Sequence, residues 1–249
     1  LNHKLDRYIE TVQSTINLVK ANKRSKHQVY ISFDEWNVWY HSNEQDRAIL
    51  AGNEGWPHAP RLLEDIYCFE DVLQVGCILN TFIRRSDSVK LACIAQLVNV
   101  IAPIMTDPMG AAWRQTIYYP YYFASIFGRG TALNLSVQCP GYDADVADNV
   151  PYLDISGVHD EEGGTVSFFA VNRHPTEVLD LSLSLQGFGA QGRMIDHQVI
   201  THPDLFAVNT AVNPMNVAPK QGAGAIVEDG ALKLGLPPFS YQVIRVAVA

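Results

Sequence analysis

Apolar side chains recur at three- and four-residue steps over the first 20 residues, which predicts an amphipathic helix. These positions are Leu5, Tyr8, Ile9, Val12, Ile16 and Val19. The basic run KANKRSK at residues 20–26 follows them. Positive charge is favoured at the C-terminal end of a helix, so we interpret this run as a helix end and a solvated loop.

A strand, a loop and a second helix follow in the pattern. Residues 29–33 are rich in β-branched and aromatic side chains, which favour a strand. Residues 41–61 contain several glycines and prolines and are expected to form a loop. Residues 62–86 show helical spacing and are almost uniformly apolar in their second half, so we expect a long, well-buried helix.

Two further apolar segments complete the first half. Residues 89–101 predict a second buried element, but periodicity does not separate strand from helix there. The aromatic-rich residues 116–130 are expected to end in a helix stopped by Gly128 or Gly130.

The pattern changes at about residue 131, where short β-type runs begin to alternate with turn residues. The runs cover residues 131–138, 152–160, 165–173, 179–188, 231–236 and 241–248. Regularly spaced short strands indicate an antiparallel β-sandwich. We therefore predict two domains, an α/β segment over residues 1–130 and an all-β domain over residues 131–249.

Composition and charge narrow the possible partners. The chain has 249 residues, with 18 Lys and Arg against 26 Asp and Glu, and a formal net charge of −8. An acidic chain without a long basic tract is a poor candidate for binding nucleic acid or an anionic membrane surface. The apolar stretch over residues 91–105 is too short and too often interrupted to span a bilayer.

The cysteines, histidines and first residue add little chemistry. The four cysteines show no C-x-x-C pair, so we expect reduced core thiols and neither a disulfide framework nor a zinc site. His197 and His202 are expected at the surface or in turns. The chain starts without Met and without an apolar signal segment. We interpret it as part of a longer protein and expect a cytoplasmic location.

The segment YISFDEWNVWY at residues 30–40 places two adjacent carboxylates, Asp34 and Glu35, at the end of the first strand. Neighbouring side chains of a strand point to opposite faces, so we expect one carboxylate to face an interior and the other to face helices or loops. A strand-end Glu followed by Trp and Asn suits a sugar site, where carboxylates act and indoles stack. The alternative is a structural carboxylate that caps a helix.

The segment ISFDEWNVWYH resembles the nucleophile-bearing strand of the family 51 glycoside hydrolases, the α-L-arabinofuranosidases. The similarity continues along the chain. It includes RYIETV, LLEDIYCFEDVLQVGCILN, AQLVNVIAPIMT, YYPYYFAS, VPYLDISGVHDEE, FAVNR and LPPFSYQVIRV. The resemblance implies the C-terminal part of a (β/α)8 TIM barrel followed by a jelly-roll type β-sandwich. It also implies retaining cleavage of terminal α-L-arabinofuranosyl groups by an oligomeric enzyme.

Three site residues follow from this resemblance by position. Glu35 corresponds to the nucleophile, and Trp39 to a tryptophan that lines the sugar pocket. Gln96 corresponds to a residue that hydrogen-bonds the exocyclic hydroxyl of the sugar. Asp34 is then a supporting or structural acid. The substrate implied is an arabinofuranosyl-containing saccharide, and the resemblance implies no metal and no organic cofactor.

A retaining glycosidase needs a second carboxyl group as acid and base, and the family carries it in an Asn-Glu pair on an earlier barrel strand. Asn53 and Glu54 imitate that pair, but they follow the nucleophile strand and lie among loop residues, so we reject them. A complete barrel needs about 250 residues and eight strands. We expect the N-terminal half of the enzyme to supply the acid/base. The alternative function is a non-catalytic carbohydrate-binding or assembly module built on the β-sandwich.

Overall fold

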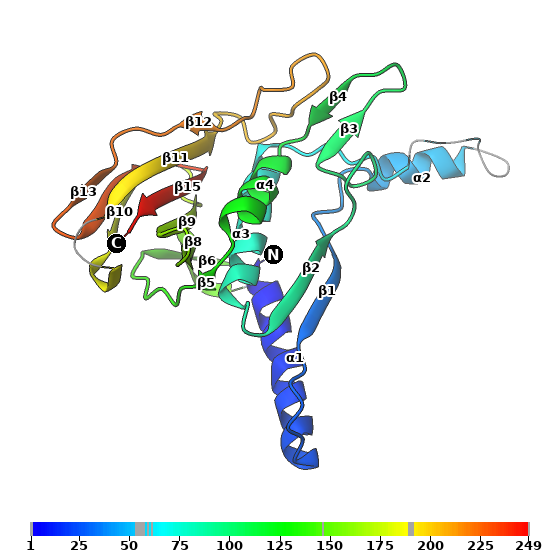
Figure 1. Cartoon of the computed structure of the whole chain (residues 1–249). Helices are drawn as coiled ribbons and strands as arrows, with labels where there is room; N and C mark the ends of the chain where they lie inside the picture. Colours follow the sequence, from blue (N-terminus) through cyan, green and yellow to red (C-terminus); the bar gives the residue numbers. More distant parts are fainter. Residues whose placement is uncertain are drawn as a thin grey trace.

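The computed structural model describes residues 2–52, 58, 60, 62–145, 147–188 and 192–248. Asn53 and Glu54 lie outside these residues. Figure 1 shows the two parts of the fold, with helices α3 and α4 between a parallel pair of strands and a β-sandwich. No helix in the described ranges combines the length and apolarity that crossing a bilayer requires.

The first part is built around a strand–helix–strand unit. Strand β1 (Ile31–Trp36) pairs in parallel with β2 (Val89–Ile94), and helix α3 (Phe69–Arg84) lies between them in the chain. Helix α1 (Asn2–Lys23) precedes β1 and projects away from the body of the molecule (Figure 1). Parallel strands need such a crossover connection, because a tight turn cannot join them.

Helices α1 and α3 cover one face of the parallel pair. The ring of Phe82 on α3 lies 5.3 Å from the rings of both Phe33 and Trp36 on β1. Ile9 of α1 and Val89 of β2 are buried in the same cluster. This face is therefore an apolar core, which accounts for the apolar second half of α3.

Three smaller elements lie near the ends of the strands. They are α2 (Asn43–Ala51), the hairpin β3 (Ile104–Thr106) and β4 (Ala112–Arg114), and α4 (Tyr118–Phe127). In Figure 1 the hairpin stands at the end of the molecule toward which β1 and β2 point. Helix α4 packs on α3, with Tyr119 and Phe123 buried.

The second part contains a six-stranded sheet in the order β12-β11-β15-β9-β8-β5 and a three-stranded sheet in the order β10-β14-β13. The strands of the larger sheet are β5 (Thr131–Ala132), β8 (Leu153–Asp160), β9 (Thr165–Asn172), β11 (Arg193–Thr201), β12 (Lys220–Gln221) and β15 (Ser240–Ala247). The others are β6 (Gly141–Ala144), β7 (Ala147–Pro151), β10 (Leu179–Ser184), β13 (Ile226–Glu228) and β14 (Ala231–Leu236), with a 3-10 turn, η1 (Gln186–Phe188). Their pairing is antiparallel, as expected for a sandwich.

Two apolar cores hold the second part together. One lies between the sheets, where Phe168 and Ile244 of the larger sheet meet Leu181 and Leu232 of the smaller one. The other joins the opposite face of the larger sheet to α3 and α4. It contains Phe69, Cys77 and Phe123 from the first part, and Phe169 and Tyr241 from the second. A shared core therefore crosses the boundary between residues 130 and 131, and the division into two domains stays a prediction.

The described residues contain one parallel pair of strands, so the (β/α)8 fold is not shown by them alone. The sheets of the second part are consistent with the predicted sandwich. Runs 152–160, 165–173, 231–236 and 241–248 correspond to strands β8, β9, β14 and β15.

The predicted helix over 62–86 begins only at Phe69, because buried polar contacts hold the preceding residues in an extended loop. The side chain of Gln115 accepts a hydrogen bond from the Tyr67 amide and donates to the Asp65 carbonyl. Leu63 has φ +60, which is incompatible with a right-handed helix.

Three other expectations need correction. Residues 41–61 contain helix α2, in which Asp46 is buried, although the sequence predicts a loop. In residues 89–101 only β2 is regular, and Leu91 is 53% exposed, so this element is not buried throughout. Residues 131–138 form strand only at Thr131–Ala132, after which the chain lines an open cavity beside β10.

Candidate active site

The carboxyl ends of β1 and β2 bring Glu35 and Gln96 to the same end of the parallel pair. Trp36 pairs with Ile94, and the Ala95 amide donates a 3.0 Å hydrogen bond to the Trp36 carbonyl. Glu35 is therefore the last residue but one of β1, and Gln96 follows β2 by two residues. Strand ends of this kind carry the chemistry of parallel α/β folds.

Strand β1 carries one extra residue near its end. Phe33 pairs with Ala92 and Trp36 with Ile94, so three steps on β1 oppose two on β2. Phe33 and Trp36 both pack on Phe82, whereas Asp34 and Glu35 are both exposed. Both carboxylates are exposed in this chain, and the expectation that one faces an interior and the other helices or loops stays a prediction. Such a β-bulge changes where side chains point and is common beside active sites.

The loop after β1 presents Trp39 to solvent between anchored neighbours. Trp39 is 53% exposed, while Val38 is buried and its carbonyl accepts a 2.8 Å hydrogen bond from the Tyr67 hydroxyl. Buried Asp65 accepts backbone hydrogen bonds from Tyr40, His41 and Ser42 at 3.2, 3.1 and 3.0 Å. The loop is therefore held by its main chain, which leaves the indole free to meet a ligand.

The residues that fix this loop have no signal in the hydrophobic pattern. Asp65 and Gln115 are fully buried, yet the residues around them in the sequence are typical of a helix or a loop. Buried polar groups must be hydrogen-bonded, but the partners here lie about 25 or 50 residues away in the chain. Only a polar residue within an otherwise apolar stretch hints at such a role.

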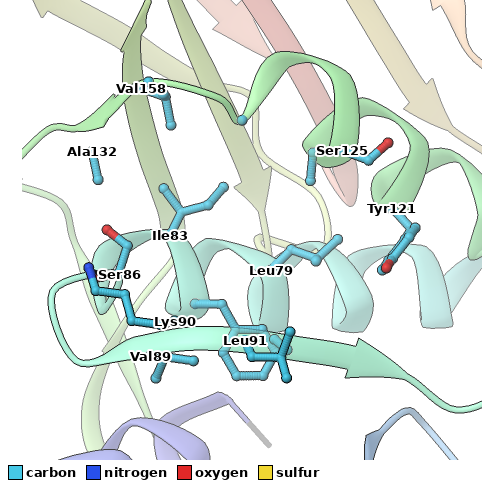
Figure 2. Close-up of a pocket in the computed structure, with 15 residues that line it drawn as sticks. Leu79, Ile83, Ser86, Val89, Lys90, Leu91, Tyr121, Ser125, Ala132 and Val158 are labelled. Atoms are coloured by element: carbon cyan, nitrogen blue, oxygen red, sulfur yellow. Dashed lines mark hydrogen bonds between the residues drawn. The ribbon is translucent and has the colours of Figure 1, made fainter. Parts of the chain in front are cut away.

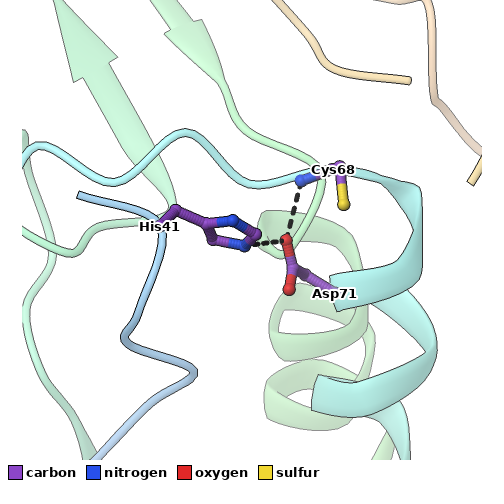
Figure 3. A group of neighbouring side chains, drawn as sticks. All are labelled: His41, Cys68 and Asp71. Carbon is purple, nitrogen blue, oxygen red and sulfur yellow. Dashed lines mark hydrogen bonds and ion pairs between the residues drawn. The ribbon is translucent and has the colours of Figure 1, made fainter. Parts of the chain in front are cut away.

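Beside the loop, His41, Cys68 and Asp71 lie together at the start of α3 (Figure 3). Their nearest ligand atoms are within 4.8 Å of one another, and they are the metal-capable group found among the described residues. His41 Nε2 lies 2.9 Å from Asp71 Oδ2, which also accepts a 2.8 Å hydrogen bond from the Cys68 amide.

This cluster is better explained as a helix cap than as a metal centre. Cys68 and Asp71 form a reciprocal capping box at the N-terminus of α3, where the helix dipole disfavours a cation. Burial, with a smaller contribution from the charge of Asp71, raises the pKa of the Cys68 thiol to about 11. The protonated thiol is a poor metal ligand. Burial also raises the pKa of Asp71, and it raises that of Tyr40 to about 12.

A cavity of about 330 Å³ lies beside β2 on the side of α3 and α4 (Figure 2). Leu79, Ile83, Leu91 and Tyr121 give it mostly apolar walls, and Lys90 lies at its edge. It does not include Glu35, Trp39 or Gln96. We therefore assign it to the packing surface of the open strand pair and not to a sugar site.

The structure also places the two histidines that are expected at the surface or in turns. His197 is buried in β11, with Nε2 2.6 Å from Gln242 Oε1, so the expectation of a surface histidine is wrong. His202 is partly buried and contacts Asp204 through Nδ1. In α4, Tyr119 and Phe123 pack in the core shared with the sandwich, so these two rings are not available to a sugar.

Enzymes with parallel α/β barrels carry their catalytic residues at strand ends, and glycosidases among them use a pair of carboxyl groups. Residues 34–240 match the family model of the alpha-L-arabinofuranosidase C-terminal domain. The chain belongs to this family, and its relatives and structural neighbours place it with the family 51 enzymes.

Curated relatives are similar along nearly the whole chain. It is 46% identical over 241 residues to an intracellular exo-α-(1→5)-L-arabinofuranosidase of Halalkalibacterium halodurans, covering 97% of this chain and 47% of that protein. An enzyme of the same description from Bacillus subtilis is 45% identical, with the same coverage. An exo-α-(1→6)-L-arabinofuranosidase of Bifidobacterium longum is 38% identical, covering 97% and 46%.

Solved structures show the same similarity in three dimensions. AbfB, a family 51 α-L-arabinofuranosidase of Bifidobacterium longum, has a TM-score of 0.88 and 32% identity, covering 98% of this chain and 48% of that one. The arabinose complex of the Thermotoga maritima enzyme has a TM-score of 0.79 and 25% identity, covering 99% and 48%. The chain thus spans about half the length of the relatives it matches.

Proposed function

We propose that this chain is the nucleophile-bearing C-terminal part of a retaining α-L-arabinofuranosidase. The observation that carries the proposal is the exposed Glu35 at the carboxyl end of β1, with Gln96 at the end of the neighbouring parallel strand. Relatives named as exo-acting arabinofuranosidases support a terminal arabinofuranosyl group as the substrate. Their names include both 1→5 and 1→6 linkages, so the linkage is left open.

In the proposed mechanism the Glu35 carboxylate attacks the anomeric carbon, and the glycosidic bond breaks as a covalent glycosyl-enzyme forms. A second carboxyl group protonates the leaving oxygen and then activates the water that releases the sugar. That group must lie about 5 to 5.5 Å from Glu35. We propose that it comes from the N-terminal half of the enzyme, which also completes the barrel around β1 and β2.

The other two site residues would bind the sugar. The exposed indole of Trp39 offers an apolar wall beside the strand end, and Gln96 offers amide groups for the exocyclic hydroxyl. We expect the complete enzyme to be a homo-oligomer. Relatives that are named intracellular support a cytoplasmic location for the complete enzyme.

The proposal is tested by Glu35→Ala in the complete enzyme. Without a nucleophile, turnover of an aryl α-L-arabinofuranoside should fall by roughly four orders of magnitude or more, comparable to the loss of other catalytic nucleophiles. Azide can occupy the space of the lost carboxylate and should restore turnover with an inverted glycosyl azide as product.

Glu44→Ala is the matched control, because Glu44 is an exposed glutamate on α2. It should leave turnover unchanged. Near-normal hydrolysis by the Glu35 variant would contradict the assignment. If residues 131–249 alone also bound arabino-oligosaccharide, the non-catalytic module would become the better explanation.

A further inference from the structure

We propose that Asn37 is a positioning residue that sets the place of Gln96 relative to Glu35. This inference rests on the proposed function, because it concerns how the same sugar site is assembled. Asn37 lies two residues after Glu35, where β1 has ended and the loop toward Trp39 begins.

The Asn37 side chain uses its amide to bridge the two strand ends. Nδ2 donates hydrogen bonds to the carbonyls of Ala95 at 2.8 Å and Ile101 at 2.5 Å. Oδ1 accepts a 2.8 Å hydrogen bond from the Val38 amide. Both donors of the amide group are thus satisfied by one loop, and its oxygen is tied to the chain that follows Glu35.

The bridged loop is the one that carries Gln96. The two carbonyls belong to the residue before Gln96 and to Ile101, and the Gln96 amide itself donates to the Ile101 carbonyl at 3.1 Å. Asn37 therefore contacts both ends of a closed backbone loop. The β1–β2 ladder ends at Trp36 and Ile94, and the hydrogen bonds of Asn37 connect the two chain segments beyond that point.

Other contacts fix the far side of this loop. Asn99 binds Thr106 of β3 through both of its side-chain polar atoms, at 3.0 and 2.8 Å. The Ile101 amide donates to the Leu63 carbonyl at 2.6 Å. These contacts tie the loop to the hairpin and to the segment before α3. Asn37 is the side chain that ties it to the strand carrying Glu35.

The consequence for catalysis follows from distance. A displacement of about 1 Å of a group that orients substrate can cost about 10²-fold in rate. Without Asn37, the Ala95 carbonyl loses the donor from the β1 side and the Ile101 carbonyl keeps only the Gln96 amide, so the loop can relax away from β1. Gln96 would then move, whereas Glu35 stays on the β1–β2 ladder. We expect Asn37→Ala to lower kcat/KM by about 10- to 100-fold.

The experiment is a double-mutant cycle in the complete enzyme with Asn37→Ala, Gln96→Ala and the double variant. If Asn37 acts through Gln96, the double variant should be no slower than Gln96→Ala alone. With an aryl 5-deoxy-α-L-arabinofuranoside, which lacks the exocyclic hydroxyl, Asn37→Ala should cost less than threefold. Losses that multiply in the double variant, or an equal loss on the deoxy substrate, would overturn the inference.

Asn172→Ala is the matched control. Its side chain donates to the carbonyls of Leu236 and Pro237 and accepts from the His174 amide, within the sandwich. It should lower the melting temperature and leave kcat/KM per folded molecule unchanged. If Asn37→Ala behaves in the same way, Asn37 is only structural. If Glu35→Ala remains active, the proposed function itself fails, whatever the cycle shows.

Discussion

The parallel pair β1–β2 and the sandwich strands β8 and β9 are built from similar residues, yet they are buried very differently. In β9 every residue from Val166 to Asn172 is buried, and in β8 the first six residues are. In β1 only Trp36 is buried, and in β2 only Val89. The sandwich strands are covered on both faces by α3 and the smaller sheet, whereas the parallel pair is covered on one.

The difference separates the sandwich, which the chain buries by itself, from the parallel pair, which the chain leaves exposed on one face. A parallel sheet is normally buried on both faces, and an exposed strand edge invites pairing with another chain. The open face of β1–β2 also carries Asp34 and Glu35, the groups to which we assign chemistry. The region that lacks cover is therefore the region that carries the proposed site.

The largest effect should come from separating this chain from the rest of the enzyme. Residues 1–249 alone should not hydrolyse an aryl α-L-arabinofuranoside, because we expect the acid/base to come from the N-terminal half of the enzyme. General acid assistance alone is worth about 10²- to 10⁴-fold, and the missing pocket wall removes binding as well. Activity and solution mass are measured after refolding.

A monodisperse monomer with turnover like that of the complete enzyme would contradict this expectation. The acid/base would then have to lie within the chain. Glu54 would be the first residue to replace, because Asn53 and Glu54 imitate the Asn-Glu pair that the family carries.

Core substitutions should separate the two regions by stability. Phe169 of β9 is buried in the core shared with α3, so Phe169→Ala should cost about 3 to 5 kcal/mol in the free energy of unfolding. Leu91 of β2 is 53% exposed, and Leu91→Ala should cost roughly 0.5 kcal/mol or less in the isolated chain. Urea denaturation measures both. Equal costs would mean that the open face of β2 is covered in solution.

Thiol labelling should show directly whether β2 is covered in the complete enzyme. Cys93 of β2 is exposed in this chain, whereas Cys77 of α3 is buried and burial raises its pKa. Iodoacetamide should therefore modify Cys93 within minutes and leave Cys77 intact until the chain unfolds. In the complete enzyme Cys93 should be protected at least tenfold, as read by mass spectrometry. Fast labelling of Cys93 in the complete enzyme would argue against a closed barrel.

The smallest effect concerns alkaline pH. Burial raises the pKa of Tyr67 beside the site loop and of Tyr241 in the sandwich above the ordinary value of about 10. Their neutral forms are favoured in the folded state. Their contribution to stability is therefore complete below pH 10 and is lost as pH rises through their folded pKa values. Tyr241→Phe should flatten this loss, and a slope unchanged by the substitution would assign it to other groups.

Much of the fold follows from local patterns, and the exceptions share a cause. The strands β8, β9 and β15 are long, apolar runs between turn residues, so the sequence predicts them as strands. The start of α3 cannot be predicted in this way. Hydrogen bonds between Gln115 and the segment that contains Asp65 hold the residues before Cys68 outside the helix. Such contacts join residues far apart in the chain and leave no periodic trace.

The site shows the same limit. The segment around Glu35 can be recognised as a strand-end carboxylate followed by indoles. The extra residue in β1, which leaves both Asp34 and Glu35 exposed, depends on pairing with β2 and breaks the simple alternation. The role inferred for Asn37 likewise depends on carbonyls about 60 residues further along.

The core that α3 shares with the larger sheet has a consequence for cooperativity. Phe82 on one side of this helix packs on β1, while Cys77 and Leu73 pack among residues of the sandwich. Loss of the sandwich would therefore remove one wall of α3 and, with it, the support of β1. We therefore expect the two regions to melt in a single transition, and we expect a cut at residue 130 to destabilise both.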